Sequence, residues 1–88
     1  IGHEVEISHY NNCDVVIDGT IALEYERPGI HTFDQICKKR DEALLKYTEV
    51  FFICQAQNYE QIKKAVGDER TIKRGKDLRD FIEKRLKT

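Results

Sequence analysis

The sequence predicts a single small α/β domain built around a mixed β-sheet. Three observations predict this fold class. Residues 3–27 alternate between apolar and polar side chains and carry two turn signals, which is typical of a three-stranded antiparallel meander. Residues 32–47 have the pattern of an amphipathic helix, and the continuous apolar run at 49–54 then predicts a buried strand. A connection of this length usually returns the chain parallel to an earlier strand, so we expect a mixed sheet with helices on its apolar face.

The three strands of the meander are separated by dipeptides that favour turns. The strands are expected at 3–10, 13–17 and 20–27. The turn dipeptides are Asn11-Asn12, Asp18-Gly19 and, at the end of the third strand, Pro28-Gly29. Asp18-Gly19 is a strong hairpin signal, because both residue types tolerate the left-handed backbone that tight hairpins require.

The pairing of the strands follows from the separation of apolar and polar side chains, because a shift of one residue turns every side chain to the other face. A three-residue loop at 18–20, with Gly19 in the left-handed region, makes one face almost wholly apolar. The pairs expected on that face are Val5 with Ile17, Ile7 with Val15, Val15 with Leu23, Ile17 with Ile21 and Cys13 with Tyr25. On the opposite face, Asp14 then lies directly across from Glu24.

Three helices and two further strands complete the order βββαβαβα. Thr32 and Gln35 are spaced as a capping box, so the first helix is expected to start there and to run to about Tyr47. Arg40 falls in the middle of the apolar stripe of this helix. After the buried strand, the remaining elements are a helix at 58–67, a short edge strand at 71–72 and a helix at 77–86.

The length of 88 residues suits one domain, 1–88, and because the chain starts with Ile1 we expect it to be part of a larger protein. No apolar run approaches the roughly 18 residues of a membrane span, so no membrane partner is expected. The three cysteines, Cys13, Cys37 and Cys54, have neither the even count of a disulfide framework nor the spacing of a zinc motif. Free cysteines are typical of a reducing compartment, and we expect the protein to be cytoplasmic.

Charge is distributed unevenly along the chain. Residues 63–88 hold ten Lys or Arg and five Asp or Glu, although the net charge of the whole chain is only −1. Within this basic part, Lys73, Arg74 and Lys76 precede the last helix, where they are candidates to bind the phosphates of a nucleic acid. The alternative is that these charges simply form the solvated faces of amphipathic helices.

Three carboxylates are expected on the polar face of the hairpin: Asp14, Glu24 and Glu26. Alternate residues of a strand share a face, so Glu24 and Glu26 point the same way, with Asp14 across the ladder. Like charges this close repel each other unless a cation or a proton intervenes. Hard oxygen ligands suit Mg²⁺ or Mn²⁺, and such an ion can activate water for phosphodiester hydrolysis. A solvated polar face, with Arg27 or lysines as partners, is the alternative.

The run CDVVIDGTIALEYER, a helix and then EVFFIC resembles the core of the PD-(D/E)xK nucleases, the restriction-endonuclease-like and Holliday-junction-resolvase-like domains. The resemblance covers residues 3–56. It implies that Asp14 and Glu24 bind Mg²⁺ or Mn²⁺, that Glu26 assists catalysis, and that the partner is a nucleic acid, DNA in preference to RNA.

Two departures from the family pattern leave two functions open. The third strand of the family carries a lysine where this chain has Glu26, and the family's leading helix has no counterpart in 1–88. Some members place the basic residue on the following helix, where Arg40 is the candidate to contact phosphate. Both departures weaken the case for catalysis, so the chain is expected to be a nucleic-acid-associated domain that, if active, is a metal-dependent nuclease. The alternative is a non-catalytic domain without a cofactor, which binds a protein partner or the rest of its parent chain.

Overall fold

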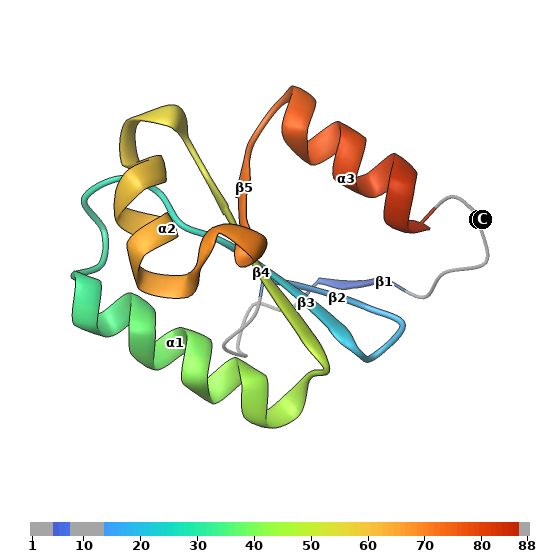
Figure 1. The fold of residues 1–88 in the computed structure, drawn as a ribbon. Helices are drawn as coiled ribbons and strands as arrows, with labels where there is room; N and C mark the ends of the chain where they lie inside the picture. Colours follow the sequence, from blue (N-terminus) through green and yellow to red (C-terminus); the bar gives the residue numbers. More distant parts are fainter. Residues whose placement is uncertain (1–4, 8–13, 87–88) are drawn as a thin grey trace.

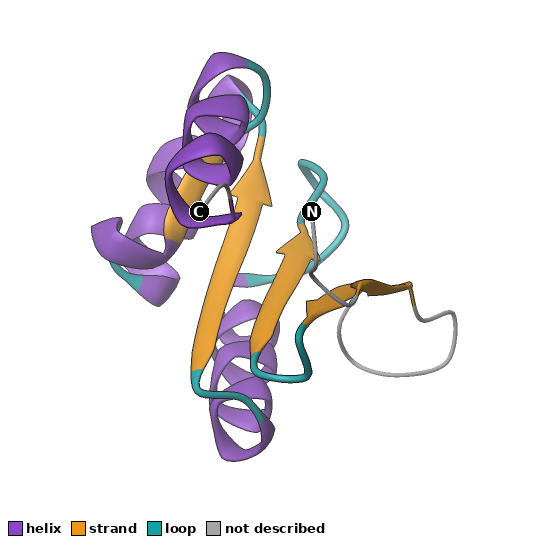
Figure 2. Cartoon of the chain, turned by 90° about the vertical axis from the view of Figure 1, so that its right-hand side faces the viewer, coloured by secondary structure: helices purple, strands orange, loops and turns teal. Residues whose placement is uncertain are grey.

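The computed structural model describes residues 5–7 and 14–86. Within them a five-stranded mixed sheet has helices on both faces (Figure 1), and its strands lie side by side in chain order (Figure 2). The strands are β1 (Val5–Ile7), β2 (Val15–Ile17), β3 (Ile21–Tyr25), β4 (Glu49–Cys54) and β5 (Thr71–Lys73). The helices are α1 (Phe33–Lys46), α2 (Tyr59–Val66) and α3 (Lys76–Leu86). The predicted α/β class and mixed sheet are confirmed.

The pairing and direction of the strands determine which strand ends lie together at the site. β1, β2 and β3 are antiparallel neighbours, whereas β3, β4 and β5 run parallel to one another. The observed pairs include four of the five that the separation of apolar side chains predicts: Val5 with Ile17, Ile7 with Val15, Val15 with Leu23 and Ile17 with Ile21. The fifth pair includes Cys13, which lies outside the described residues. In the second turn, Asp18 joins Gly19 at positive φ, a conformation that aspartate tolerates better than most residues.

The helices begin and end close to the expected residues. Thr32 and Gln35 form the reciprocal capping box at the start of α1, and Gly67 ends α2 at a φ of 98°. α3 begins at Lys76, one residue earlier than expected. Within the described part of the chain, no helix is both long and apolar enough to cross a bilayer.

Both faces of the sheet are covered, which differs from the prediction of a single apolar face under the helices. α1 and α2 pack on the face that carries Val16, Ala22 and Phe52, whereas α3 packs on the face of the hairpin's odd-numbered apolar residues, as Figure 1 shows. The reason lies in β4, whose continuous apolar run needs cover on both faces. The carboxylate face of β3 is therefore the face that α1 covers, and it is not a solvated surface.

Replacing Gly67 with alanine is expected to lower the free energy of unfolding by about 1–2 kcal/mol, as judged by urea denaturation. Gly67 has a φ of 98° and a ψ of 152°, a conformation that L side chains rarely adopt, and the end of the Glu69 side chain would have to move away from an added Cβ. Gly29→Ala is the comparison, because Gly29 also has positive φ and an added Cβ there meets no atom within 4 Å. Equal stability of Gly67→Ala and the wild type would contradict this account of the helix end.

Candidate functional site

Asp14 and Glu24 are held together at one edge of the sheet. Because β2 and β3 are antiparallel, Asp14, just before β2, lies at the end of β3 that carries Glu24. The backbone N–H of Asp14 donates to Oε1 of Glu24 at 3.1 Å, and Oδ2 of Asp14 accepts from the N–H of Tyr25 at 2.7 Å. The structure thus brings together the two residues that the sequence pattern selects as metal ligands.

Glu24 is a buried carboxylate with an unsatisfied oxygen. The residue is fully buried, and its Oε2 accepts no hydrogen bond from the described residues. The nearest cation is the ammonium of Lys39, whose Nζ lies 3.9 Å away. Burial raises the pKa of Glu24 to about 7, an effect that Lys39 opposes and Asp14 reinforces. A positive charge supplied at this oxygen would relieve the cost of the buried anion.

Glu26 is also buried, but both of its oxygens have partners. Nζ of Lys39 lies 2.6 Å from Oε1, and Nδ1 of His31 lies 2.9 Å from Oε2. The buried Asn58 donates to the backbone carbonyl of Glu26 at 3.1 Å and fixes the strand end. Glu26 therefore holds side chains in place and is not a third free ligand beside Asp14.

The basic residue at these carboxylates is Lys39, and Arg40 lies elsewhere. Arg40 donates from Nη1 to the carbonyl of Ala65 in α2 and from Nε to Asp41 at 2.9 Å. The hydrogen bond to Ala65 ties α1 to α2, so the placement of Arg40 differs from the expectation of a free phosphate-binding side chain. Residues 39 and 40 both border the buried stripe of Ile36 and Ala43, and Lys39, which the sequence reasoning did not single out, is the one that contacts the carboxylates. It also overlooked His31.

The predicted phosphate-binding segment lies at the same edge of the sheet. The N–H of Arg74 donates to the carbonyl of Cys54 at 2.8 Å, and its Nη1 lies 3.5 Å from the hydroxyl of Tyr25, the residue between the two buried glutamates. Lys73 lies over the ring of Tyr59, with Nζ 4.8 Å from the centroid. Ligands of open α/β sheets commonly bind outside the carboxyl ends of the strands, where these residues lie.

Lys76, the third basic residue of this segment, is the first residue of α3. Its ammonium forms an exposed ion pair with Asp80, one turn along α3, at 2.8 Å. This pair raises the pKa of Lys76 and lowers that of Asp80. An exposed pair of this kind is weak, so it leaves the lysine available to a polyanion.

Comparison of the chain with protein-family models, with curated proteins and with solved structures finds no match. The chemistry that the site can perform therefore has to follow from its own residues.

The donor set fits one hard cation that keeps most of its water. Among the described residues, no group of three or more His, Cys, Asp or Glu is arranged to hold a metal ion. Mg²⁺ does not require such a group, because it is commonly bound by one or two carboxylates, with water and substrate phosphate completing its shell. Asp14 and the unsatisfied oxygen of Glu24 provide such a pair.

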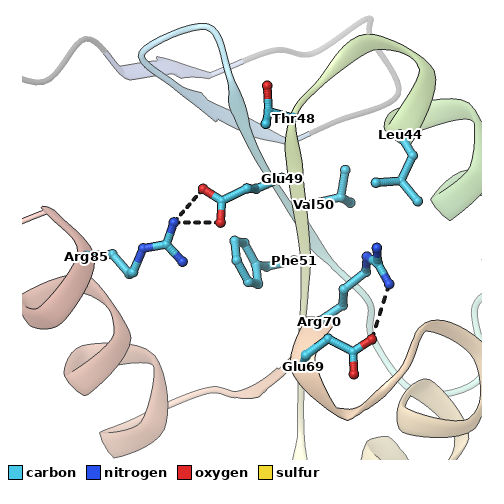
Figure 3. A pocket seen from close by; sticks show the side chains of 8 residues that line it. All are labelled: Leu44, Thr48, Glu49, Val50, Phe51, Glu69, Arg70 and Arg85. Atoms are coloured by element: carbon cyan, nitrogen blue, oxygen red, sulfur yellow. Dashed lines mark hydrogen bonds and ion pairs between the residues drawn. The ribbon is translucent and has the colours of Figure 1, made fainter.

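A cavity of about 300 Å³ lies at the opposite end of β4 (Figure 3). Its charged residues are paired within it: Arg85 with Glu49, and Arg70 with Glu69 at 3.3 Å. Glu49 pairs with Ile21 at the start of β3, whereas the carboxylates lie at its end. The cavity is therefore not part of the carboxylate site.

Proposed function

We propose that this domain hydrolyses phosphodiester bonds in nucleic acid, using a divalent cation held by Asp14 and Glu24. The observation that carries the proposal is the buried carboxylate of Glu24, whose Oε1 accepts from the N–H of Asp14 while its Oε2 accepts no hydrogen bond from the described residues. A fully buried anion is costly unless a positive charge accompanies it, and the ammonium of Lys39 is 3.9 Å away. The all-oxygen pair favours Mg²⁺ or Mn²⁺ over softer metals.

The side chains around the pair supply the other requirements of this reaction. A bound divalent ion lowers the pKa of coordinated water and offsets the charge that develops on a phosphate. Lys39 reaches the carboxylates from α1 and supplies a positive charge beside them, the kind of group that a lysine of the third strand supplies in PD-(D/E)xK nucleases. Glu26 holds that lysine at 2.6 Å and thus acts as a positioning residue.

The basic segment suits DNA as the substrate, the choice that the PD-(D/E)xK resemblance also favours. If Lys73, Arg74 and Lys76 are all replaced by alanine, affinity for DNA should fall equally for different sequences, and the slope of log K against log salt should become shallower by two to three. Fluorescence anisotropy at several salt concentrations measures both quantities. Alanine at three other exposed lysines, Lys46, Lys64 and Lys84, is the control of equal charge. Equal slopes for the two triple variants would contradict a role for this segment.

Cleavage assays on labelled single-stranded and duplex DNA, with Mn²⁺, Mg²⁺ or EDTA, test the proposed function. We expect cleavage that requires the metal and falls by at least about 100-fold in Glu24→Gln, because loss of even an outer partner of a metal costs roughly 10- to 100-fold. Glu83→Gln, at an exposed position of α3, is the control. Cleavage by neither metal would reject hydrolysis and favour the alternative of a non-catalytic binding or assembly domain.

A further inference from the structure

The carboxylate site contains a second ionisable pair, formed by His31 and Glu26. Nδ1 of His31 lies 2.9 Å from Oε2 of Glu26, whose side chain is only 1% exposed. The imidazole itself is 34% exposed, so one edge of the ring faces the buried carboxylate while part of the ring reaches solvent. A buried carboxylate that holds one nitrogen of a partly exposed imidazole is the arrangement that orients histidines in proton-transfer sites.

The hydrogen bonds of Glu26 bear on which imidazole nitrogen carries the hydrogen. Lys39 donates to Oε1 of Glu26 at 2.6 Å, and an ammonium can only donate, so Glu26 is an acceptor there. Where Glu26 accepts at Oε2 as well, the hydrogen of the imidazole lies on Nδ1. Nε2 then carries a lone pair and is free to take up a proton.

Glu26 and Lys39 connect this imidazole to the proposed cation site. Glu26 follows Glu24 by two residues and shares its face, which corresponds to about 7 Å along an extended chain. Lys39 connects the two carboxylates, with Nζ 2.6 Å from Glu26 and 3.9 Å from Glu24. His31 immediately precedes Thr32, the capping residue of α1, so the capped helix end anchors its backbone.

We propose that His31 is the general base of the hydrolysis, an inference that rests on the proposed function. Nε2 takes a proton from a water molecule as the water oxygen forms a bond to phosphorus. The bond from phosphorus to the leaving oxygen breaks, and that oxygen takes a proton from solvent. Glu26 holds the ring through Nδ1 and stabilises the imidazolium that forms.

Two variants of His31 separate proton transfer from a structural role. His31→Gln keeps an amide donor that can bond to Glu26 but has no group able to accept the proton. His31→Ala leaves space that free imidazole can enter. With DNA and saturating Mn²⁺, both variants should lose on the order of 100-fold or more in the rate of cleavage, and added imidazole should restore activity to His31→Ala alone. The wild type with the same imidazole controls for metal chelation, and thermal melting verifies that both variants fold.

The outcomes distinguish this inference from the proposed function on which it rests. If the wild type cleaves DNA and His31→Gln retains its rate, or if imidazole fails to rescue His31→Ala, the general-base assignment is overturned and the metal-dependent reaction stands. If the wild type itself shows no metal-dependent cleavage, the proposed function is overturned and the assignment of His31 falls with it.

Discussion

Replacing Glu24 with glutamine is expected to raise the metal-free stability of the domain by about 3 kcal/mol at pH 8 and to leave it nearly unchanged at pH 4. The pKa of Glu24 rises from 4.5 to about 7 on folding, chiefly because the carboxylate is buried. A raised pKa means that the folded state holds its proton more tightly than the unfolded state. The wild type therefore loses stability as the pH rises from about 4.5 to about 7, and the neutral glutamine does not.

The wild type and Glu24→Gln also test whether the site binds a cation. An ion that binds only the folded state stabilises it by about 2.7 kcal/mol at one hundred times its dissociation constant. Mn²⁺ should therefore raise the melting temperature of the wild type at pH 8 but not that of Glu24→Gln. Removing the charge of Asp14 should raise the metal-free stability by less, because Asp14 is exposed whereas Glu24 is fully buried.

Thermal melting at pH 4, 6 and 8, with and without Mn²⁺, measures both effects. Glu83→Gln removes one exposed carboxylate and serves as the matched control. A gap between the wild type and Glu24→Gln that does not change with pH would contradict the raised pKa. A wild type that does not respond to millimolar Mn²⁺ or Mg²⁺ would contradict the cation site and leave the fold unaffected.

The hairpin was predictable from the sequence because one physical constraint determines its register. Only one pairing gathers Val15, Ile17, Ile21 and Leu23 on one face, and that pairing places Asp14 beside the end of β3. The neighbouring strand β4 was equally predictable, because a largely apolar run of six residues is typical of a buried strand. Local patterns of this kind do not depend on how distant elements pack.

The burial of the carboxylates was missed, although the sequence contains a signal for it. An apolar run such as EVFFIC predicts a strand with both faces covered, and β3 pairs directly with it. Glu24 pairs with Phe52, which is fully buried, so its face of the sheet had to be covered as well. The alternation within the hairpin alone suggested a solvated face, because it took no account of the neighbouring strand.

The choice between Lys39 and Arg40 could not be made from periodicity. Both residues border the stripe of Ile36 and Ala43, and they lie on opposite sides of it. Which side faces the carboxylates depends on the rotation of α1 about its axis, and this rotation is set by packing against α2. The hydrogen bond from Arg40 to the carbonyl of Ala65 shows the result of that packing.

Replacing Lys39 with methionine is expected to lower the free energy of unfolding by about 2–3 kcal/mol at pH 7.5, because it leaves the carboxylate of Glu26 buried without its ammonium partner. This expected loss is at or below the lower end of the range for removing one partner of a buried ion pair, because the lysine side chain is 23% exposed. Methionine keeps an unbranched apolar stem of similar length, so packing changes little. Lys38→Met, at the exposed neighbouring position, is the matched control.

The stability that Lys39→Met loses should also depend on Glu24, because the ammonium of Lys39 lowers the pKa of Glu24. Without that ammonium the pKa of Glu24 rises further, so more of the stability is lost as Glu24 ionises. In Lys39→Met combined with Glu24→Gln, the cost of removing the lysine should be smaller than in the wild-type background, and a double-mutant cycle by urea denaturation measures the difference. If Lys39→Met destabilises no more than Lys38→Met, the lysine does not compensate the buried carboxylates, and its role in the proposed site is contradicted.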